Sequence, residues 1–154
     1  MFLWEHLLLL SLDLDGDGRA DLIWRNAASG ANVIWLSADS SRAKPMTAVV
    51  DSAWKIVGTG DFDGDGQADI LWRQSKTGSN ETWRSGDSNR RLAVPAVTDL
   101  HWVVVAVGDF NGDRKADIVW RNATTGQDVI WRAAVRSVQW PVTDVSNLSW
   151  QIVP

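Results

Sequence analysis

The sequence predicts an all-β protein built from three tandem units, each with four short antiparallel strands. Three observations support this prediction. A nine-residue acidic loop begins at Asp13, Asp61 and Asp109, so each copy follows the last by 48 residues. Nine of the eleven tryptophans recur at the same interval. Each interval also contains short apolar runs rich in β-forming residues, and periods of this length are typical of arrays of structural units.

The period divides the chain into one repeat domain over residues 1–154. Its composition is that of an ordinary globular domain, with 45% hydrophobic and 22% charged residues. The three units are expected over about residues 7–53, 54–101 and 102–149, followed by an extra closing strand at 150–154.

The first strand of each unit is predicted just before its acidic loop. The segments are "WKIVGTG" before the second loop, "WVVVAVG" before the third, and a degraded copy, "HLLLLSL", before the first. The opening "MFLWEHLLLLSL" is similar to a signal peptide, but it lacks a basic start and a small-residue cleavage site. We therefore expect a structural strand at residues 7–10.

The second and third strands form a predicted hairpin. The runs "ADLIWR", "ADILWR" and "ADIVWR" are nearly all apolar, which suits a strand covered on both faces. A polar turn ending in glycine follows each run, and then a short run ending in tryptophan, "NVIW", "NETW" or "DVIW". Two such runs joined by a short glycine-containing turn indicate a β-hairpin.

The fourth strand is the least regular, and its position is inferred from its prolines. Pro45, Pro95 and Pro141 lie beside valines or in short extended runs. Proline cannot donate to a strand ladder, so these segments are expected at strand starts or on an outer edge. Four short strands in 48 residues are typical of a β-propeller blade. No segment shows sustained helical spacing, so few helices are expected.

The acidic loop has the chemistry of a site for a hard cation. In the pattern D-x-D-G-D-G-x-x-D, the side chains at positions 1, 3 and 5 converge while the chain turns around them. Position 7 can offer its carbonyl, and position 9 adds a carboxylate. Oxygen ligands in this number suit Ca²⁺ better than Mg²⁺, which prefers a tighter octahedron. Position 12 is tryptophan rather than the glutamate of a helical EF-hand, so a β-loop-β setting is predicted.

The pattern "VGTGDFDGDGQADILWR" and its two counterparts resemble the FG-GAP/VCBS repeat family of Ca²⁺-binding propeller blades, which also occur in integrin α-chains and bacterial secreted proteins. The resemblance covers about residues 7–154. It implies four-stranded blades around an axis and about three Ca²⁺ ions per chain, each bound between the first and second strands. The ligands it implies are Asp13, Asp15, Asp17, the Arg19 carbonyl and Asp21; Asp61, Asp63, Asp65, the Gln67 carbonyl and Asp69; and Asp109, Asn111, Asp113, the Lys115 carbonyl and Asp117.

The third loop departs from the pattern at two positions. Asn111 removes one negative charge, and Arg114 replaces the glycine at position 6. A non-glycine residue in a left-handed conformation costs roughly 1 kcal/mol. The third site is therefore predicted to bind Ca²⁺ most weakly.

Composition excludes several functions. With no cysteines, the chain has neither disulfides nor thiolate zinc sites. The net charge is −4, but the loops hold eleven of the nineteen acids, four in each of the first two and three in the third. Three bound divalent ions would make the balance positive, so an acidic partner surface is not indicated. No basic cluster suggests nucleic-acid binding, and no segment is long enough to span a membrane.

Two interpretations remain open for each repeated feature. Calcium is expected to be structural rather than a signal, because clustered carboxylates repel one another without their ion. The tryptophans are expected to form the core between blades, although exposed ones would suit stacking on sugar rings. The repeated arginines after them (Arg25, Arg73 and Arg121) are expected to bind a neighbouring carboxylate or carbonyl rather than a substrate.

Three blades are fewer than the four to eight that usually close a propeller. Two apolar flanks would face water, so self-association is predicted, most simply as a two-fold dimer with a six-bladed ring. In that ring the segment 150–153 would complete a blade of the partner, competing with or replacing residues 7–10. The alternative is that the chain is a fragment of a longer propeller, natural, recombinant or designed.

A non-enzymatic binding module, either an adhesion domain or a lectin with a glycan or protein ligand, is the favoured function. The sequence shows no nucleophile-base arrangement, and the eight acids outside the loops recur only in part. The alternatives are a non-catalytic accessory fragment of a larger secreted enzyme, or a designed or ancestral-type scaffold without a ligand. Such loops suit the millimolar Ca²⁺ outside cells, so an extracellular or cell-surface location is expected.

Overall fold

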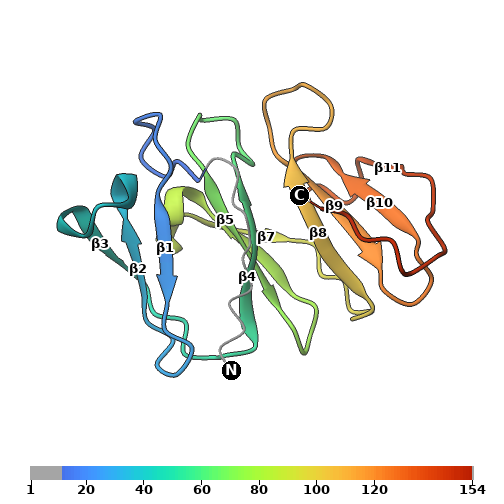
Figure 1. Ribbon diagram of the computed structural model, residues 1–154, viewed down its shortest axis with the longest axis horizontal. Coiled ribbons are helices and arrows are strands. Elements are labelled where there is room, and N and C mark those ends of the chain that lie inside the picture. The colour runs from blue at the N-terminus through green and yellow to red at the C-terminus, as the bar shows by residue number, and fades with distance from the viewer. Residues whose placement is uncertain (1–11, 154) are drawn as a thin grey trace.

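The computed structural model describes residues 12–153, which form three antiparallel sheets lying side by side (Figure 1). Each sheet comes from one 48-residue unit. The first sheet has the order β1-β2-β3, the second β4-β5-β6-β7, and the third β8-β9-β10-β11. The strands of the first sheet are β1 (Leu22–Arg25), β2 (Asn32–Trp35) and β3 (Ala43–Met46). The strand predicted at residues 7–10 lies outside the described residues.

The second and third sheets each contain the four strands that the sequence predicts. Those of the second sheet are β4 (Trp54–Gly60), β5 (Asp69–Gln74), β6 (Asn80–Trp83) and β7 (Arg91–Val94). Those of the third are β8 (Trp102–Gly108), β9 (Asp117–Asn122), β10 (Asp128–Trp131) and β11 (Gln139–Pro141). The prediction of four-stranded antiparallel units is confirmed for these two.

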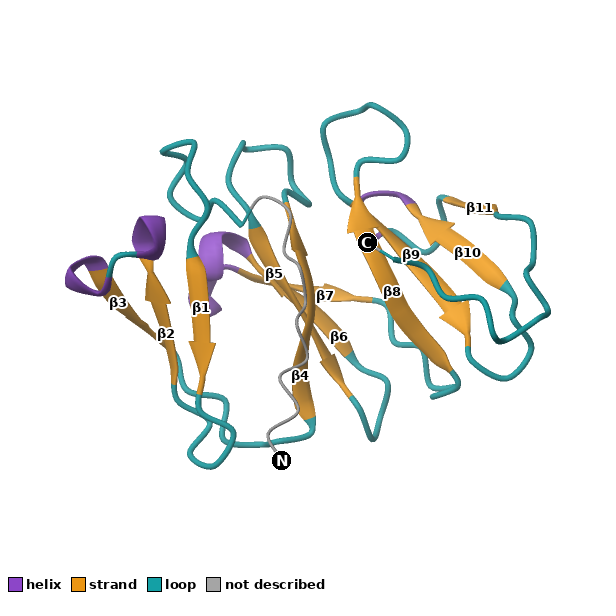
Figure 2. Cartoon of the chain, viewed as in Figure 1, coloured by secondary structure: helices purple, strands orange, loops and turns teal. Residues whose placement is uncertain are grey.

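The helical elements within residues 12–153 are 3-10 turns of three residues each (Figure 2). They connect the third strand of a unit to its outer strand. They are η1 (Leu36–Ala38), η2 (Ser40–Arg42), η3 (Arg84–Gly86), η4 (Ser88–Arg90) and η5 (Arg132–Ala134). The expectation of few helices is confirmed. No helix in this part of the chain has the length and apolar character needed to cross a membrane.

The two complete sheets repeat one another in register as well as in strand order. The pairing of β4 with β5 shifts between Ile56 and Gly58, and that of β8 with β9 shifts between Val104 and Ala106. These shifts lie 48 residues apart and increase the local twist of the strand. Beside them, β4 and β8 approach so closely that a Cβ on Gly58 would lie 2.5 Å from Val107 Cγ2.

The core lies between the sheets and consists of two equivalent layers. One layer joins the first and second sheets around Trp72, and the other joins the second and third around Trp120. Each of these indoles is 1% exposed and packs against a second tryptophan of its own sheet, Trp83 or Trp131, with ring centroids 5.0 and 5.1 Å apart. The expectation that the repeated tryptophans form a core is therefore confirmed for these four.

The outer strands carry the prolines as predicted. Pro45 lies in β3 and Pro141 in β11, which are edge strands, and Pro95 directly follows the edge strand β7. The predicted closing strand behaves differently in the isolated chain. Residues 151–153 are exposed and adopt no strand, so pairing of this segment with another blade stays a prediction.

Candidate metal centres

The three acidic loops lie along the same edge of the three sheets, at the top of the view in Figure 1. They span residues 13–21, 61–69 and 109–117. In the second and third units each loop joins the first strand to the second, β4 to β5 and β8 to β9. The loops therefore repeat in space as they do in sequence.

The first aspartate of each loop organises the turn. In the second loop, Asp61 Oδ1 accepts hydrogen bonds from the N–H groups of Gly64 and Asp65 at 2.6 and 3.1 Å, and its Oδ2 accepts one from Gly66 at 2.8 Å. Asp13 and Asp109 accept the equivalent bonds in their own loops. The N–H of Arg114, and then those of residues 111–113, hold the pKa of Asp109 below its usual value. Such bonds favour a charged carboxylate.

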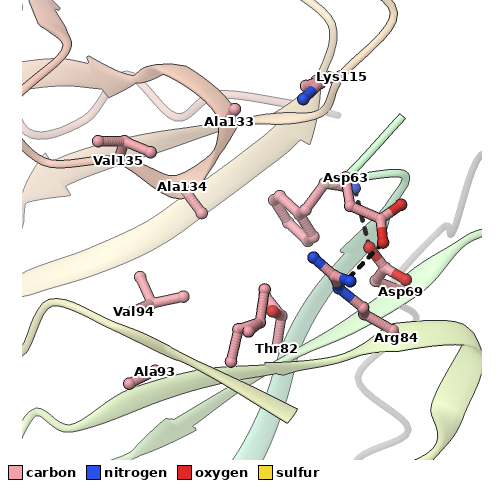
Figure 3. A pocket seen from close by; sticks show the side chains of 12 residues that line it. Asp63, Asp69, Thr82, Arg84, Ala93, Val94, Lys115, Ala133, Ala134 and Val135 are labelled. Atoms are coloured by element: carbon pink, nitrogen blue, oxygen red, sulfur yellow. Dashed lines mark hydrogen bonds and ion pairs between the residues drawn. The ribbon is translucent and has the colours of Figure 1, made fainter. Parts of the chain in front are cut away.

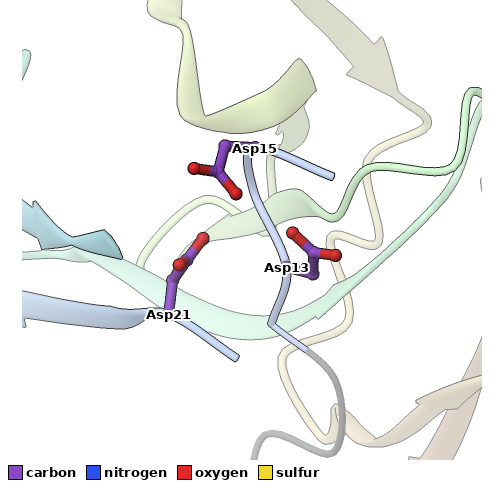
Figure 4. A group of neighbouring side chains, drawn as sticks. All are labelled: Asp13, Asp15 and Asp21. Carbon is purple, nitrogen blue, oxygen red and sulfur yellow. The ribbon is translucent and has the colours of Figure 1, made fainter. Parts of the chain in front are cut away.

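Carboxylates converge in the first and second loops. Oxygen atoms of Asp13, Asp15 and Asp21 lie within 4.8 Å of one another (Figure 4), and so do those of the set Asp61, Asp63 and Asp65. The two loops thus bring together overlapping but different parts of the predicted ligand sets. Their donors are all carboxylate oxygens, which fits a hard cation such as Ca²⁺ rather than a soft transition metal.

The aspartate at position 9 ties each loop to the body of its sheet. Asp21, Asp69 and Asp117 are at most 2% exposed. Asp69 accepts hydrogen bonds from the N–H groups of Phe62 at 3.0 Å and Ser85 at 2.9 Å, and the other two accept the equivalent pair. The second donor lies in the 3-10 turn after the third strand and has a left-handed φ of 46 to 50°. These strained turns position an N–H group against a buried carboxylate.

Asp69 shows the electrostatic cost of this arrangement. Burial raises the pKa of its carboxyl to about 6, and repulsion from Asp63 and Asp65 adds to the rise, although the two backbone N–H groups oppose it. A cation bound among the three carboxylates would favour the ionised form. The acidic group of this loop could therefore hold an ion that compensates its charge.

Arginines from the 3-10 segments also contact the loops, which the sequence reasoning missed. Arg84 Nε lies 2.9 Å from Asp63 Oδ2, and Arg42 lies 3.3 Å from Asp15 and 3.4 Å from Asp17. Longer pairs of 3.7 Å join Arg90 to Asp65 and Arg132 to Asp113. A signal was present, because Arg42 and Arg90 are 48 residues apart, as are Arg84 and Arg132.

The second loop borders a pocket of about 310 Å³ between the second and third sheets (Figure 3). Asp63, Asp69 and Arg84 lie on one side, and residues 133–135 lie on the other. The ion pair of Arg84 with Asp63 therefore forms part of the pocket wall.

The third loop differs in its side chains, as the sequence indicates. The side-chain amide of Asn111 donates to Asp117 Oδ2 at 3.2 Å, so a hydrogen-bond donor takes the place of a carboxylate oxygen. Among the described residues, this loop has no group of three acids as close as those of the other loops. Arg114 has φ +67°, which confirms a left-handed residue at position 6.

Two further pockets lie between the sheets and are each lined by three tryptophans. One of about 330 Å³ contains Trp54, Trp72 and Trp83, and one of about 280 Å³ contains their equivalents Trp102, Trp120 and Trp131. Trp54 and Trp102 are the partly exposed members of the two sets. Charged side chains also line the pockets, Asp51, Glu81 and Arg91 in the first and Arg136 in the second.

The repeated arginines bind the protein itself. Arg73 donates to the carbonyls of Gly78, Val97 and Trp102 and to the Asn80 side chain, at 3.0 to 3.1 Å. Its guanidinium also lies 4.9 Å from the ring centroid of Trp120 in the next sheet. Arg25 makes the equivalent contacts, and Arg121 pairs with Asp128 at 2.6 Å. The expectation that these arginines bind neighbouring groups of the protein is therefore confirmed.

Comparison with protein families gives a match. The family described as FG-GAP-like repeat matches residues 13–72 and residues 61–120. Each match begins at the first aspartate of an acidic loop and ends at the buried tryptophan of the next sheet. No curated protein and no solved structure matches the chain.

Proposed function

The chain belongs to the FG-GAP-like repeat family, and on that basis we propose that it is a non-catalytic binding module whose three sheets are β-propeller blades stabilised by calcium. The observation that carries the proposal is the convergence of three carboxylates within 4.8 Å in each of the first two loops. Carboxylate oxygens in this number suit Ca²⁺.

The residues proposed to hold the ion are the loop aspartates. When bound, the ion supplies positive charge that offsets the repulsion among them. Position 1 orders the turn through its backbone hydrogen bonds, positions 3 and 5 would supply further carboxylate oxygens to the ion, and the buried aspartate of position 9 connects the loop to the 3-10 turn. The proposed role is structural. An ion that binds the folded chain and not the unfolded one stabilises the fold.

Calorimetric titration of the chelator-treated chain with Ca²⁺ tests this proposal. We expect two tighter sites and a weaker third one. In the Asp63→Asn variant, the binding heat of the second site should disappear. Asp99→Asn is the matched control, because Asp99 lies outside the loops with a half-exposed side chain. No Ca²⁺ binding would overturn the proposal, and a third loop that binds most tightly would contradict the ranking.

Glycan binding is the second candidate, and the two tryptophan-lined pockets favour it. They repeat at equivalent places, and the lining of each combines indole rings with polar groups. Aromatic faces and a few polar groups are typical of small-molecule sites. A glycan array probed with and without chelator is the test. Binding of one class of sugar by the wild type, and weaker binding of that class by Trp102→Ala, would support a lectin. If the calcium-loaded chain binds no glycan, a protein-binding or scaffold role is left.

An extracellular or cell-surface location follows from the same chemistry. Sites of exposed loop carboxylates are filled at the millimolar Ca²⁺ found outside cells. A dissociation constant for the two tighter sites below about 1 mM would be compatible with this location.

A further inference from the structure

The two internal interfaces between sheets are formed by equivalent residues. Each interface has two faces, and the first sheet exposes the residues that form one of these faces in the second and third sheets. Ile70 and Trp72 are buried by the first sheet, at 0% and 1% exposure, and their equivalents Ile118 and Trp120 are buried by the second sheet. In the first sheet the same positions are Leu22 and Trp24, which are 42% and 41% exposed. Ala20 is exposed as well, whereas Ala68 and Ala116 are buried. We call Ala20, Leu22 and Trp24 the leading face.

The third sheet exposes the residues that form the opposite face of each internal interface. Phe62 is 7% exposed because the third sheet covers it, but its equivalent Phe110 is 49% exposed. Val94 and Val142 differ in the same way, at 6% and 37%. Val145, the equivalent of the partly buried Val97, is 39% exposed. We call Phe110, Val142 and Val145 the trailing face.

Polar contacts also repeat across the two internal interfaces, and the third sheet lacks the equivalent contacts within residues 12–153. Ala68 N–H donates to the carbonyl of Asp13 and Ala116 N–H to that of Asp61, both at 2.6 Å, so each acidic loop is braced by the next unit. Within residues 12–153 no such bond reaches the carbonyl of Asp109. Arg121 likewise lies over no indole of this part of the chain, whereas Arg25 and Arg73 each lie over the tryptophan of the next sheet.

We infer that the leading face of one chain packs on the trailing face of a second copy and repeats the interface already present twice within the chain. The occupant of the trailing face must supply an alanine N–H, an aliphatic residue and a tryptophan at the spacing of Ala68, Ile70 and Trp72. The first unit of a second copy carries these groups, exposed, in Ala20, Leu22 and Trp24.

This inference goes beyond the proposed calcium-binding function. In the assembly, residues of the second copy would contact the third acidic loop of the first. Ala20 N–H of the second copy would donate to the Asp109 carbonyl, and its Trp24 would lie beneath Arg121. Two copies joined in this way at both ends bury both leading and both trailing faces. The six sheets of such a ring lie within the range of four to eight blades seen in propellers.

Sedimentation velocity of the calcium-loaded chain tests the inference, with circular dichroism to verify folding. We expect twice the 17.0 kDa mass of one chain. Leu22→Lys alters only the leading face and Val142→Lys, which lies outside the acidic loops, only the trailing face, so each should dissociate the assembly. Leu92→Lys is the matched control, because Leu92 is 47% exposed on the edge strand β7 and its equivalent in the first unit is Lys44.

A mixture of the two dissociated variants distinguishes this pairing from others. The Leu22→Lys chain retains an intact trailing face and the Val142→Lys chain an intact leading face, so an equimolar mixture should recover a species of two chains. A folded wild-type monomer at micromolar concentration would overturn the inference. Association that survives both substitutions, or that only one of them weakens, would overturn the assignment of the two faces.

Discussion

At the sixth position of each acidic loop the backbone is left-handed, whichever residue occupies it. Gly18 and Gly66 have φ of +81 and +86°, and Arg114 has +67°. An L-residue pays a steric penalty there because its Cβ approaches the backbone carbonyl, whereas glycine has no Cβ. The third loop therefore stores strain that the other two do not.

Arg114→Gly should raise the free energy of unfolding by about 1 kcal/mol. The N–H that donates to Asp109 Oδ2 at 2.9 Å is retained in this variant, so the loop keeps its hydrogen bonds. Urea unfolding of the calcium-free chain measures the change. Gly66→Arg is the reverse substitution at the equivalent position and should lower stability by a similar amount. Equal stability of the wild type and both variants would contradict the strain argument.

Each hairpin between the second and third strands of a unit packs its turn against the segment that follows the outer strand. Gly78 has φ +75°, its carbonyl accepts a hydrogen bond from Val97 N–H at 2.9 Å, and a Cβ added there would lie 2.0 Å from Val97 O. Gly30 and Gly126 are in the same situation in the other two units. The turn glycine is thus required by both conformation and close approach.

Gly78→Ala should destabilise the chain by more than the roughly 1 kcal/mol that a left-handed alanine costs. The excess comes from the clash with a backbone carbonyl, which cannot move aside as a flexible side chain would. Gly18→Ala is the control, because Gly18 has a similar φ of +81° but no heavy atom within 4 Å of the added Cβ. Thermal unfolding of the two variants measures the difference, and equal losses would contradict the packing argument.

The stability of the whole molecule is linked to calcium through buried carboxylates such as Asp69. The folded calcium-free chain raises the pKa of Asp69 to about 6 from an ordinary value of 3.8. A raised pKa means that the fold favours the protonated form. The stabilising contribution of that protonation is complete below pH 3.8 and is lost as the pH rises through 6.

In calcium-free buffer, the wild type should therefore lose on the order of 1–3 kcal/mol of stability relative to Asp69→Asn between about pH 4 and pH 6. The amide carries no charge, so the variant lacks this titration. Urea unfolding at several pH values measures the difference between the two chains. Saturating Ca²⁺ should remove or reverse this loss in the wild type only. A difference that is independent of pH would contradict the linkage.

Local composition and spacing were enough to predict the strand order of the second and third sheets, the edge position of the prolines and the place of the acidic loops. These features depend on local composition and on a 48-residue period that recurs without change. The left-handed sixth position also follows from local reasoning, because glycine occupies it in two copies and the turn has one geometry.

Which copies of a repeated residue are buried, and what they contact, became evident only from the folded chain. Trp24 and Trp72 occupy equivalent places in nearly identical strands, yet one is 41% exposed and the other 1%. The arginines that contact the loop carboxylates also come from other elements, such as η3, which supplies Arg84. The physical reason is that burial and charge pairing depend on the neighbouring sheet or element in space, which a local pattern does not specify.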